Sequence, residues 1–128
     1  MKIKGIERVA LQVKDIDQSI KFFSRLFGTT FQRQNVQIND SVIKVAFSPL
    51  GIELLEETDL EKESLRSFHL RVENIQDVHP AVLEAGGEIL AHFTVGEMEH
   101  MIAKIGDFRI VFVSYEGNDS LKALSSGK

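Results

Sequence analysis

Alternation of apolar and polar residues gives the first indication of the fold. Val9, Leu11 and Val13 alternate with small or polar residues, which is the period-two pattern of a half-buried strand. Asp15 then predicts a helix N-cap, and Gln18 three residues later completes a capping box. The chain therefore begins with a strand that leads directly into a capped helix.

The helix after this cap is predicted by apolar residues at helical spacing. They are Ile16, Ile20, Phe23 and Phe27, supported by Phe22 and Leu26. Gly28 should end the helix, because a left-handed C′ position favours glycine. Further strands are expected over residues 31–37, 41–47 and 52–55, separated by turn residues. The first half of the chain thus has the order β-α-β-β-β.

The second half of the chain repeats this order. Phe68, Leu70 and Val72 alternate with polar residues, and Asn74 takes the cap position that Asp15 has in the first half. Each of these positions follows its counterpart by 59 residues. The repeat predicts that the second half folds into the same unit as the first.

Pro80 complicates the helix of the second half. We expect an irregular turn over residues 76–79 and a regular helix with Pro80 as its first residue, where proline is tolerated. Strands then follow over residues 88–93, 98–105 and 108–114.

Together these elements predict an α+β fold. Two βαβββ repeats would form one curved, partly closed mixed β-sheet barrel, with the helices on its convex side. The polar faces of the strands would line a concave cup, a common place for a small-molecule site. We expect a single domain over residues 1–116, with repeats at about 4–57 and 67–116, a linker at 58–66 and a mobile tail at 117–128.

Composition narrows the class of protein. The chain has 128 residues, of which 43% are hydrophobic and 27% charged, and its formal charge is −4. The chain lacks a cluster of basic residues of the kind that binds nucleic acid. It also lacks an apolar run suited to a membrane span or a signal peptide. Because it has no cysteine, disulfides and thiolate metal sites are excluded. We therefore expect a cytoplasmic protein that binds neither nucleic acid nor membrane. Nine phenylalanines against one tyrosine and no tryptophan indicate that most aromatic residues fill the core.

The strand–helix segment and its repeat resemble the vicinal oxygen chelate superfamily. This superfamily includes glyoxalase I, methylmalonyl-CoA epimerase, extradiol dioxygenases, and the fosfomycin and bleomycin resistance proteins. The resemblance is carried by Val9 to Ile16, Ser19, Phe22-Phe23, Leu26 to Gly28, Gly51 to Glu56 and Ala85 to Gly87. It implies the fold described above and a homodimer. It leaves the activity open, because many chemistries use this scaffold.

Enzymes of this family typically hold a divalent metal with four side chains from four strands. The resemblance places these positions on Arg8, Glu53, Ser67 and Val111. Only Glu53 is a good ligand, because arginine stays protonated, serine is a poor ligand and valine is none. We therefore predict no metal and no other cofactor. The fallback for a divalent metal is a rebuilt site of Glu53, His69 and His100.

The resemblance also predicts a direct contact between Arg8 and Glu53, because two ligand positions of one metal lie close together. The alternative is that Arg8 is an ordinary surface arginine. The predicted ligand-binding residues are Arg8, Gln12, Glu53, Ser67, His69, Arg71, Arg109 and Val111. Arg71 and Arg109 would suit an acidic or phosphorylated ligand. A solvated position for Arg109, which is near a turn, is the alternative.

Three functions remain open. The first is a metal-independent protein that binds a small organic molecule, and anionic molecules are among the candidates. The second is a lyase, isomerase or epimerase of the glyoxalase I or methylmalonyl-CoA epimerase type, with or without a divalent metal. In that enzyme Glu53 would be the general base and Arg8 the electrophile. The third is a chain whose cup is filled by its own side chains and which acts through protein contacts.

Overall fold

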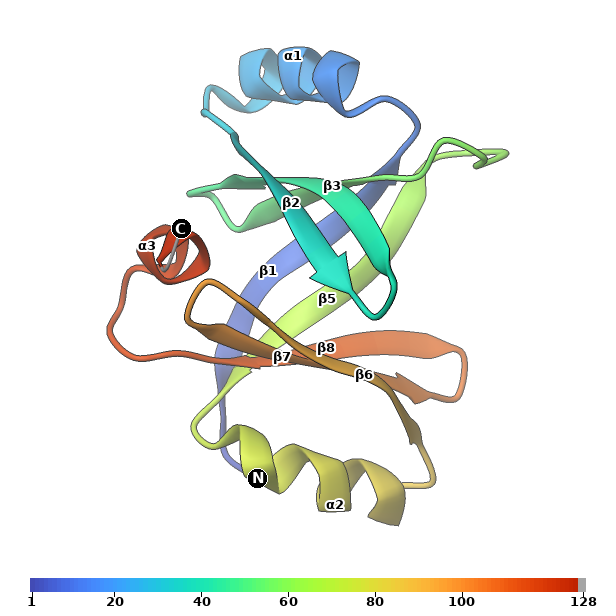
Figure 1. Ribbon diagram of the computed structural model, residues 1–128, viewed down its shortest axis with the longest axis vertical. Helices are drawn as coiled ribbons and strands as arrows, with labels where there is room; N and C mark the ends of the chain where they lie inside the picture. Colours follow the sequence, from blue (N-terminus) through green and yellow to red (C-terminus); the bar gives the residue numbers. More distant parts are fainter. Residues whose placement is uncertain (127–128) are drawn as a thin grey trace. The chain divides into compact units, whose positions relative to one another are not determined.

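The computed structural model describes residues 1–126, and the chain divides into two compact units. The N-terminal unit is Arg8–Arg66. The C-terminal unit combines Met1–Glu7 with the chain from Ser67 onward. Strand β1 (Ile3–Val13) takes part in both units, because the boundary falls inside it (Figure 1).

The N-terminal unit consists of a mixed sheet and one helix. After β1 come α1 (Ile16–Phe27), β2 (Gln32–Ile38), β3 (Ser41–Ser48) and β4 (Ile52–Glu56). The strand order is β2-β3-β4-β1, antiparallel except that β1 and β4 run parallel. Helix α1 packs on one face of this sheet, and the buried core between them contains Val13, Ile16, Ala46 and Leu54.

Both ends of helix α1 have the predicted caps. The Asp15 side chain accepts a hydrogen bond from the Gln18 N–H, and Gly28 is left-handed with φ 62°. An aspartate N-cap typically stabilises a helix by about 1 kcal/mol. The Asp15 N-cap and the glycine stop are therefore confirmed, while the reciprocal bond that Gln18 would add to complete a capping box stays a prediction.

The C-terminal unit has the same plan. It contains β5 (Ser64–Val72), a 3₁₀ turn η1 (Ile75–Asp77), α2 (Val78–Glu84), β6 (Glu88–Val95), β7 (Met98–Ile105) and β8 (Phe108–Ser114). The order is β5-β8-β7-β6, with β5 and β8 parallel. The core beneath its helix contains Val72, Ile75, Val78, Val82, Met101, Ala103 and Phe112. Because β5 starts at Ser64, the predicted linker ends three residues too late.

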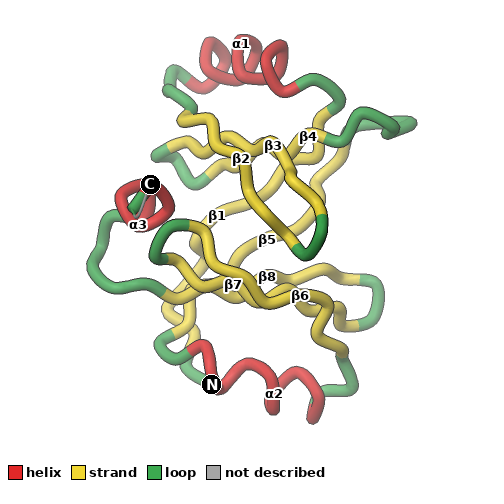
Figure 2. Tube along the Cα trace, viewed as in Figure 1, coloured by secondary structure: helices red, strands yellow, loops and turns green. Residues whose placement is uncertain are grey.

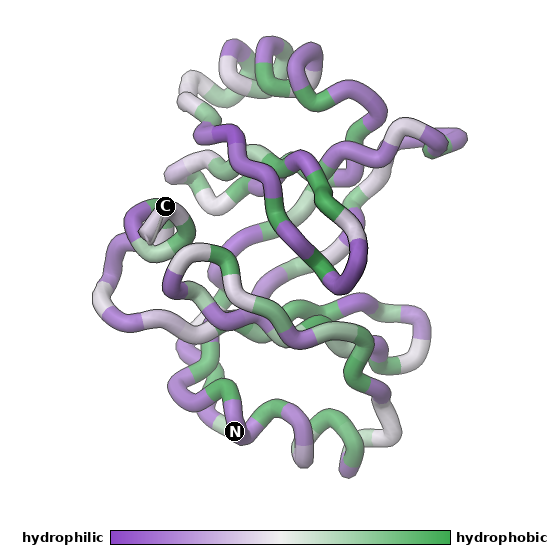
Figure 3. Tube along the Cα trace, in the orientation of Figure 1, coloured by the Kyte–Doolittle hydropathy of each residue, from purple (hydrophilic) through white to green (hydrophobic). Residues whose placement is uncertain are grey.

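Two βαβββ repeats with mixed sheets make the fold α+β, as the sequence predicts. In each unit one helix covers one face of its own sheet. Figure 3 shows how hydrophobic and hydrophilic residues alternate along the strands. This alternation is the pattern from which the two repeats are predicted. None of the helices within residues 1–126 is long and apolar enough to cross a membrane.

The start of helix α2 differs from the prediction. The helix begins at Val78, so Pro80 is its third residue and not its first. The first turn of a helix has no acceptors for its N–H groups, so a proline there loses no hydrogen bond. The predicted cap at Asn74 is present and accepts from the Gln76 N–H. The left-handed glycine after α2 is Gly86, with φ 86°.

The predicted mobile tail contains a third helix. Helix α3 (Ser120–Ser125) lies beside the turn between β6 and β7 (Figure 2), and Leu124 is only 1% exposed. The Glu97 N–H donates to the Ala123 carbonyl at 2.8 Å. The prediction is therefore wrong for these residues, because it weighs polar composition and misses the buried side chains. Its last two positions, 127–128, lie outside the described residues.

Phenylalanine is less uniformly buried than the composition indicates. Phe22 is 61% exposed, Phe27 is 39% exposed and Phe108 is 70% exposed. Two of these three residues belong to helix α1, whose outer side is therefore unusually apolar.

Candidate functional site

The centre of the site is an ion pair between Arg8 on β1 and Glu53 on β4. In the parallel ladder Ala10 is in register with Glu53, and Arg8 lies two residues before Ala10 on the same face. The Arg8 Nε donates to the Glu53 Oε1 at 2.7 Å, and the two side chains are 6% and 7% exposed. The predicted contact is confirmed, and the alternative of an ordinary surface arginine is wrong.

An aromatic ring completes this centre. Phe47 on β3 is in register with Glu53, and the Arg8 guanidinium carbon lies 4.9 Å from the centre of the Phe47 ring. Phe47 is 2% exposed. A guanidinium held between a carboxylate and an aromatic face has little freedom to reorient. Arg8 is therefore fixed in position within the N-terminal unit.

Gln12 is in register with Leu55 in the same ladder, and it is half-buried. Its side-chain amide donates to the Glu57 carboxylate, at the start of the linker. Gln12 thus follows Arg8 along the same face of β1 and ties the linker to that strand.

In the C-terminal unit the predicted residues form a buried histidine cluster. His69 on β5 is in register with Val111 on β8, and His100 on β7 is in register with Val113. The His69 and His100 rings are 5.9 Å apart and nearly perpendicular, while Phe93 stacks on His100 at 4.9 Å. The His100 Nδ1 is 3.1 Å from the Met98 carbonyl, so this nitrogen carries the proton that is donated.

Ser67 precedes His69 on the same face of β5 and is 6% exposed. Val111, which is 3% exposed, is buried between the β5 and β7 strands that carry the two histidines. The histidine cluster is therefore set in largely apolar surroundings, and it lies in the unit that does not contain Glu53.

The two arginines predicted to bind anions have different surroundings. Arg71 donates from Nη2 to the carbonyls of Tyr115 and Gly117, at 2.8 and 2.7 Å, and its guanidinium carbon lies 3.7 Å from the centre of the Tyr115 ring. Its main contacts therefore hold the segment that follows β8. Arg109 is half-buried, is in register with Lys104, and forms no ion pair with any residue of the described chain.

The residues at the four metal positions of the family do not fit a divalent ion. The one carboxylate among them, Glu53, already accepts a hydrogen bond from Arg8, which cannot deprotonate near neutral pH. Ser67 is a weak metal ligand, and the Val111 side chain has no atom that can bind a metal. Within neither unit of the described chain are three His, Asp or Glu side chains grouped so that they could hold a metal. The fallback set of Glu53, His69 and His100 takes residues from both units and stays a prediction.

Three aromatic residues of these clusters are not predicted from the sequence. Tyr115 stacks on Arg71 and donates its hydroxyl to the Glu7 carboxylate at 2.9 Å. Phe93 stacks on His100, and Phe47 lies under Arg8. The single tyrosine of the chain was an available signal, but its partners are distant in sequence and no local pattern pairs them.

Two βαβββ units, each with a mixed sheet and one helix, define the class of fold to which this chain belongs. The model of the glyoxalase/bleomycin resistance protein/dioxygenase superfamily matches residues 5–123. The chain belongs to this superfamily, which confirms the resemblance seen in the sequence. No curated protein matches it in sequence.

Solved structures similar to this chain share its fold at low sequence identity. Methylmalonyl-CoA epimerase from Mycobacterium tuberculosis is 14% identical with a TM-score of 0.75, and the match covers 90% of each chain. A variant of the Streptomyces coelicolor methylmalonyl-CoA epimerase bound to 2-nitronate-propionyl-CoA is 11% identical with a TM-score of 0.73, covering 91% of this chain and 100% of that one. A hypothetical protein from Bacillus halodurans C-125 is 16% identical with a TM-score of 0.69, covering 88% and 95%.

Proposed function

We propose that this chain is a binding protein for a small organic molecule and works without a divalent metal. The observation that supports this proposal is the buried Arg8–Glu53 contact of 2.7 Å. It supplies a fixed positive and a fixed negative group at two positions where metal-dependent relatives carry ligands. A ligand would bind to these oriented charges through hydrogen bonds and not through a metal.

The ligand that we propose carries an anionic group. Arg109 supports this preference, because its charge is not neutralised by an ion pair within residues 1–126 and Lys104 lies opposite it. Two like charges in register on adjacent strands repel each other, and a bound carboxylate or phosphate would relieve that repulsion. Arg71 supports it less, because its guanidinium already bonds two backbone carbonyls.

Metal analysis and a thermal-shift screen test this proposal together. We expect purified protein to contain far less than stoichiometric zinc, nickel, cobalt or manganese. Among a panel of small carboxylic acids and organic phosphates, at least one should raise the melting temperature, because a ligand that binds the folded state stabilises it by mass action. The double variant Arg8→Met with Glu53→Met should fold and lose this shift, whereas Lys122→Glu should keep it.

Stoichiometric metal in the purified protein would contradict the proposal. So would a panel in which no compound shifts the melting temperature, which is the result expected if the chain acts only through protein contacts.

The second candidate is an epimerase or lyase in which Glu53 is the general base. The structural similarity to methylmalonyl-CoA epimerases favours it. In the epimerase this base would remove the proton next to a thioester carbonyl, and a proton from solvent would return to the opposite face of the same carbon, while Arg8 stabilises the negative charge that develops on oxygen.

Hydrogen exchange in deuterated water distinguishes this enzyme from the binding protein. Methylmalonyl-CoA is incubated with the protein, and loss of the proton at its second carbon is followed by NMR. The binding protein should give exchange no faster than buffer. Fast exchange that Glu53→Gln abolishes would establish the enzyme instead.

We also propose that the protein is a cytoplasmic homodimer. The lack of cysteine and of a membrane-crossing helix in residues 1–126 is compatible with this. Sedimentation velocity of the purified chain tests the oligomeric state, and a monomer at micromolar concentration would contradict it.

A further inference from the structure

Helix α1 has a wider apolar face than its own sheet covers. Ile16, Ile20 and Phe23 pack against the sheet of the N-terminal unit. Phe22 and Leu26, one turn apart on the neighbouring side of the helix, are 61% and 62% exposed. Large apolar side chains in adjacent exposed positions are typical of an interaction surface.

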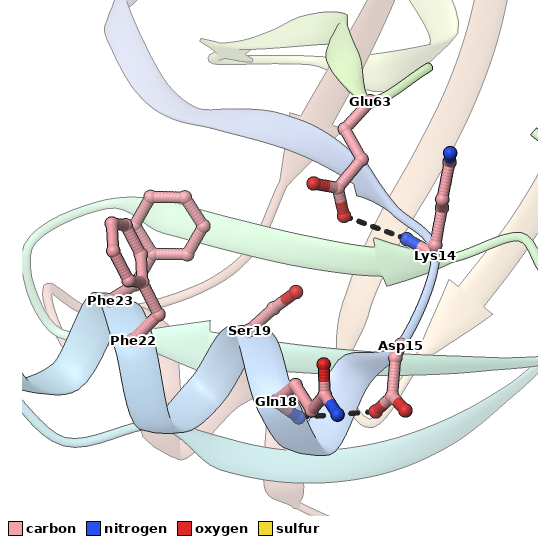
Figure 4. Close-up of a pocket in the computed structure, with 7 residues that line it drawn as sticks. All are labelled: Lys14, Asp15, Gln18, Ser19, Phe22, Phe23 and Glu63. Atoms are coloured by element: carbon pink, nitrogen blue, oxygen red, sulfur yellow. Dashed lines mark hydrogen bonds between the residues drawn. The ribbon is translucent and has the colours of Figure 1, made fainter. Parts of the chain in front are cut away.

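Two adjoining hollows lie along this side of the helix. The first, of about 400 Å³, is lined by Lys14, Asp15, Gln18, Ser19, Phe22, Phe23 and Glu63 (Figure 4). The second, of about 670 Å³, is lined by Gln18, Lys21, Phe22, Arg25 and Leu26. Because Gln18 and Phe22 line both hollows, they form one elongated surface, here called the α1 groove.

Ser19 gives the α1 groove a buried polar group. Ser19 is 9% exposed, and its hydroxyl makes no hydrogen bond with any described residue. Figure 4 shows the hydroxyl directed into the hollow, between the Phe22 and Phe23 rings and the Lys14–Glu63 wall. Serine in a helix commonly bonds to a preceding carbonyl, whereas the Ser19 hydroxyl lines the hollow and has its hydrogen-bonding capacity unused by the protein. A polar group of a ligand would satisfy it.

The positive charge of the α1 groove is concentrated in its second hollow, which is lined by Lys21 and Arg25 and by no carboxylate, whereas the first hollow carries Lys14 with Asp15 and Glu63. The Asp15 carboxylate accepts from the Gln18 N–H at 3.1 Å, and the Glu63 carboxylate accepts from the Lys14 N–H at 2.9 Å. Both carboxylates are thus engaged with the backbone. By contrast, the side chains of Lys14, Lys21 and Arg25 form no ion pair within residues 1–126.

We propose that the α1 groove docks an acidic segment of a partner protein. An apolar side chain of the segment would insert beside Phe22 and Leu26, and its carboxylates would lie over Lys21 and Arg25. Two adjoining hollows suit the side chains of an extended segment better than the flat surface of a bilayer. This surface belongs to the N-terminal unit alone and does not depend on the ligand proposed above.

Selection from a displayed library of short random peptides tests the proposal. Peptides that bind the full chain should be enriched in Asp and Glu next to Phe, Leu or Ile. Binding of a synthetic copy should weaken at least about tenfold in Phe22→Ser and in the double variant Lys21→Glu with Arg25→Glu, because central anchors dominate such interfaces. It should also weaken as salt is added.

Matched variants elsewhere on the chain serve as controls. Phe108→Ser removes an equally exposed aromatic residue, and Lys4→Glu with Lys122→Glu reverses two charges outside the groove. Both should bind the peptide as the parent chain does. Ser19→Ala tests the hydroxyl alone and should weaken binding without lowering the melting temperature.

Three results would overturn the proposal. The first is a selection that yields no acidic peptides, or peptides whose binding the groove variants leave unchanged. The second is binding to vesicles of anionic phospholipid that Phe22→Ser abolishes while no peptide binds. The third is a dimer that Phe22→Ser dissociates, since a second copy would then cover the groove.

Discussion

Arg8 has a charge that cannot be removed by deprotonation, and its guanidinium contacts the Glu53 carboxylate and the Phe47 ring. Removing only one member of a buried ion pair leaves the other charge without compensation. Replacing both members by apolar residues of similar size removes that penalty. The two kinds of substitution therefore separate the role of the pair in folding from its role in binding.

We predict that Arg8→Met lowers the free energy of unfolding by about 3–5 kcal/mol, because it leaves Glu53 buried without its guanidinium. Adding Glu53→Met should restore most of the loss. Urea denaturation of both single variants and the double variant measures the coupling. Additive effects of the two substitutions would show that Arg8 and Glu53 do not stabilise each other.

At the scale of elements, the caps of the helices differ in a way that can be measured. Asp15 accepts a backbone hydrogen bond at the start of α1, whereas Asp77 at the start of α2 makes no such bond with its side chain. Asp15→Ala should cost about 1 kcal/mol of stability and Asp77→Ala less than about 0.5 kcal/mol. Thermal unfolding of the two variants provides the comparison, and equal losses would contradict it.

The docking of α3 depends on a glycine in the turn between β6 and β7. Gly96 has φ 61°, and an added Cβ would lie 2.3 Å from the Ala123 carbonyl oxygen. Gly106 has nearly the same φ, 60°, but an added Cβ meets nothing within 4 Å. Both alanine variants share the backbone strain of about 1 kcal/mol, and only one displaces the helix.

We therefore expect Gly96→Ala to destabilise the chain clearly more than Gly106→Ala. Amide hydrogen exchange should also show that Gly96→Ala exposes α3 while Gly106→Ala leaves it protected. Equal protection of α3 in the two variants would show that the turn does not hold the helix.

Local signals explain which parts of the fold could be predicted from sequence. Asp15 with Gln18, Gly28 and Asn74 act on their own neighbours, so a short stretch of sequence is enough to place them. Helix α3 could not be placed in this way, because it is only six residues long and its Leu124 is buried by contacts far along the chain. Pro80 was misplaced because a proline at any position of the first turn loses no bond.

The candidate site was predictable only where the family resemblance supplied a geometry. The Arg8–Glu53 contact joins residues 45 positions apart, and no periodicity in either strand pairs them. Arg71 was assigned to a ligand because its partners, the carbonyls of Tyr115 and Gly117, are backbone groups that every residue carries. The α1 groove was missed because helical spacing assigns Phe22 to the core whether or not anything covers it.

At the scale of the whole molecule, the unit boundary does not follow the repeat boundary at the N-terminus. Met1–Glu7 precede the first repeat's helix in sequence but belong to the C-terminal unit. The Glu73 N–H donates to the Lys2 carbonyl at 3.0 Å, and Tyr115 donates to Glu7. The beginning of the chain is therefore part of the second repeat's structure.

Removing residues 1–5 should accordingly loosen the C-terminal unit. We expect faster amide hydrogen exchange at Glu73 and along β5, because the Lys2 carbonyl is no longer present to accept. Amides of β3, in the other unit, should exchange as in the full chain. Faster exchange confined to β3 and β4 would contradict the assignment of these residues.

The shared strand also has a consequence for synthesis on the ribosome. Residues 1–7 are translated well before the Glu73 amide and the Tyr115 hydroxyl that they contact. At bacterial and eukaryotic elongation rates, roughly 3–13 seconds separate the translation of Glu7 from that of Glu73. During this interval the Lys2 carbonyl and the Glu7 carboxylate lack the partners that they have in the C-terminal unit, so these hydrogen bonds form only after residues 73 and 115 have been added.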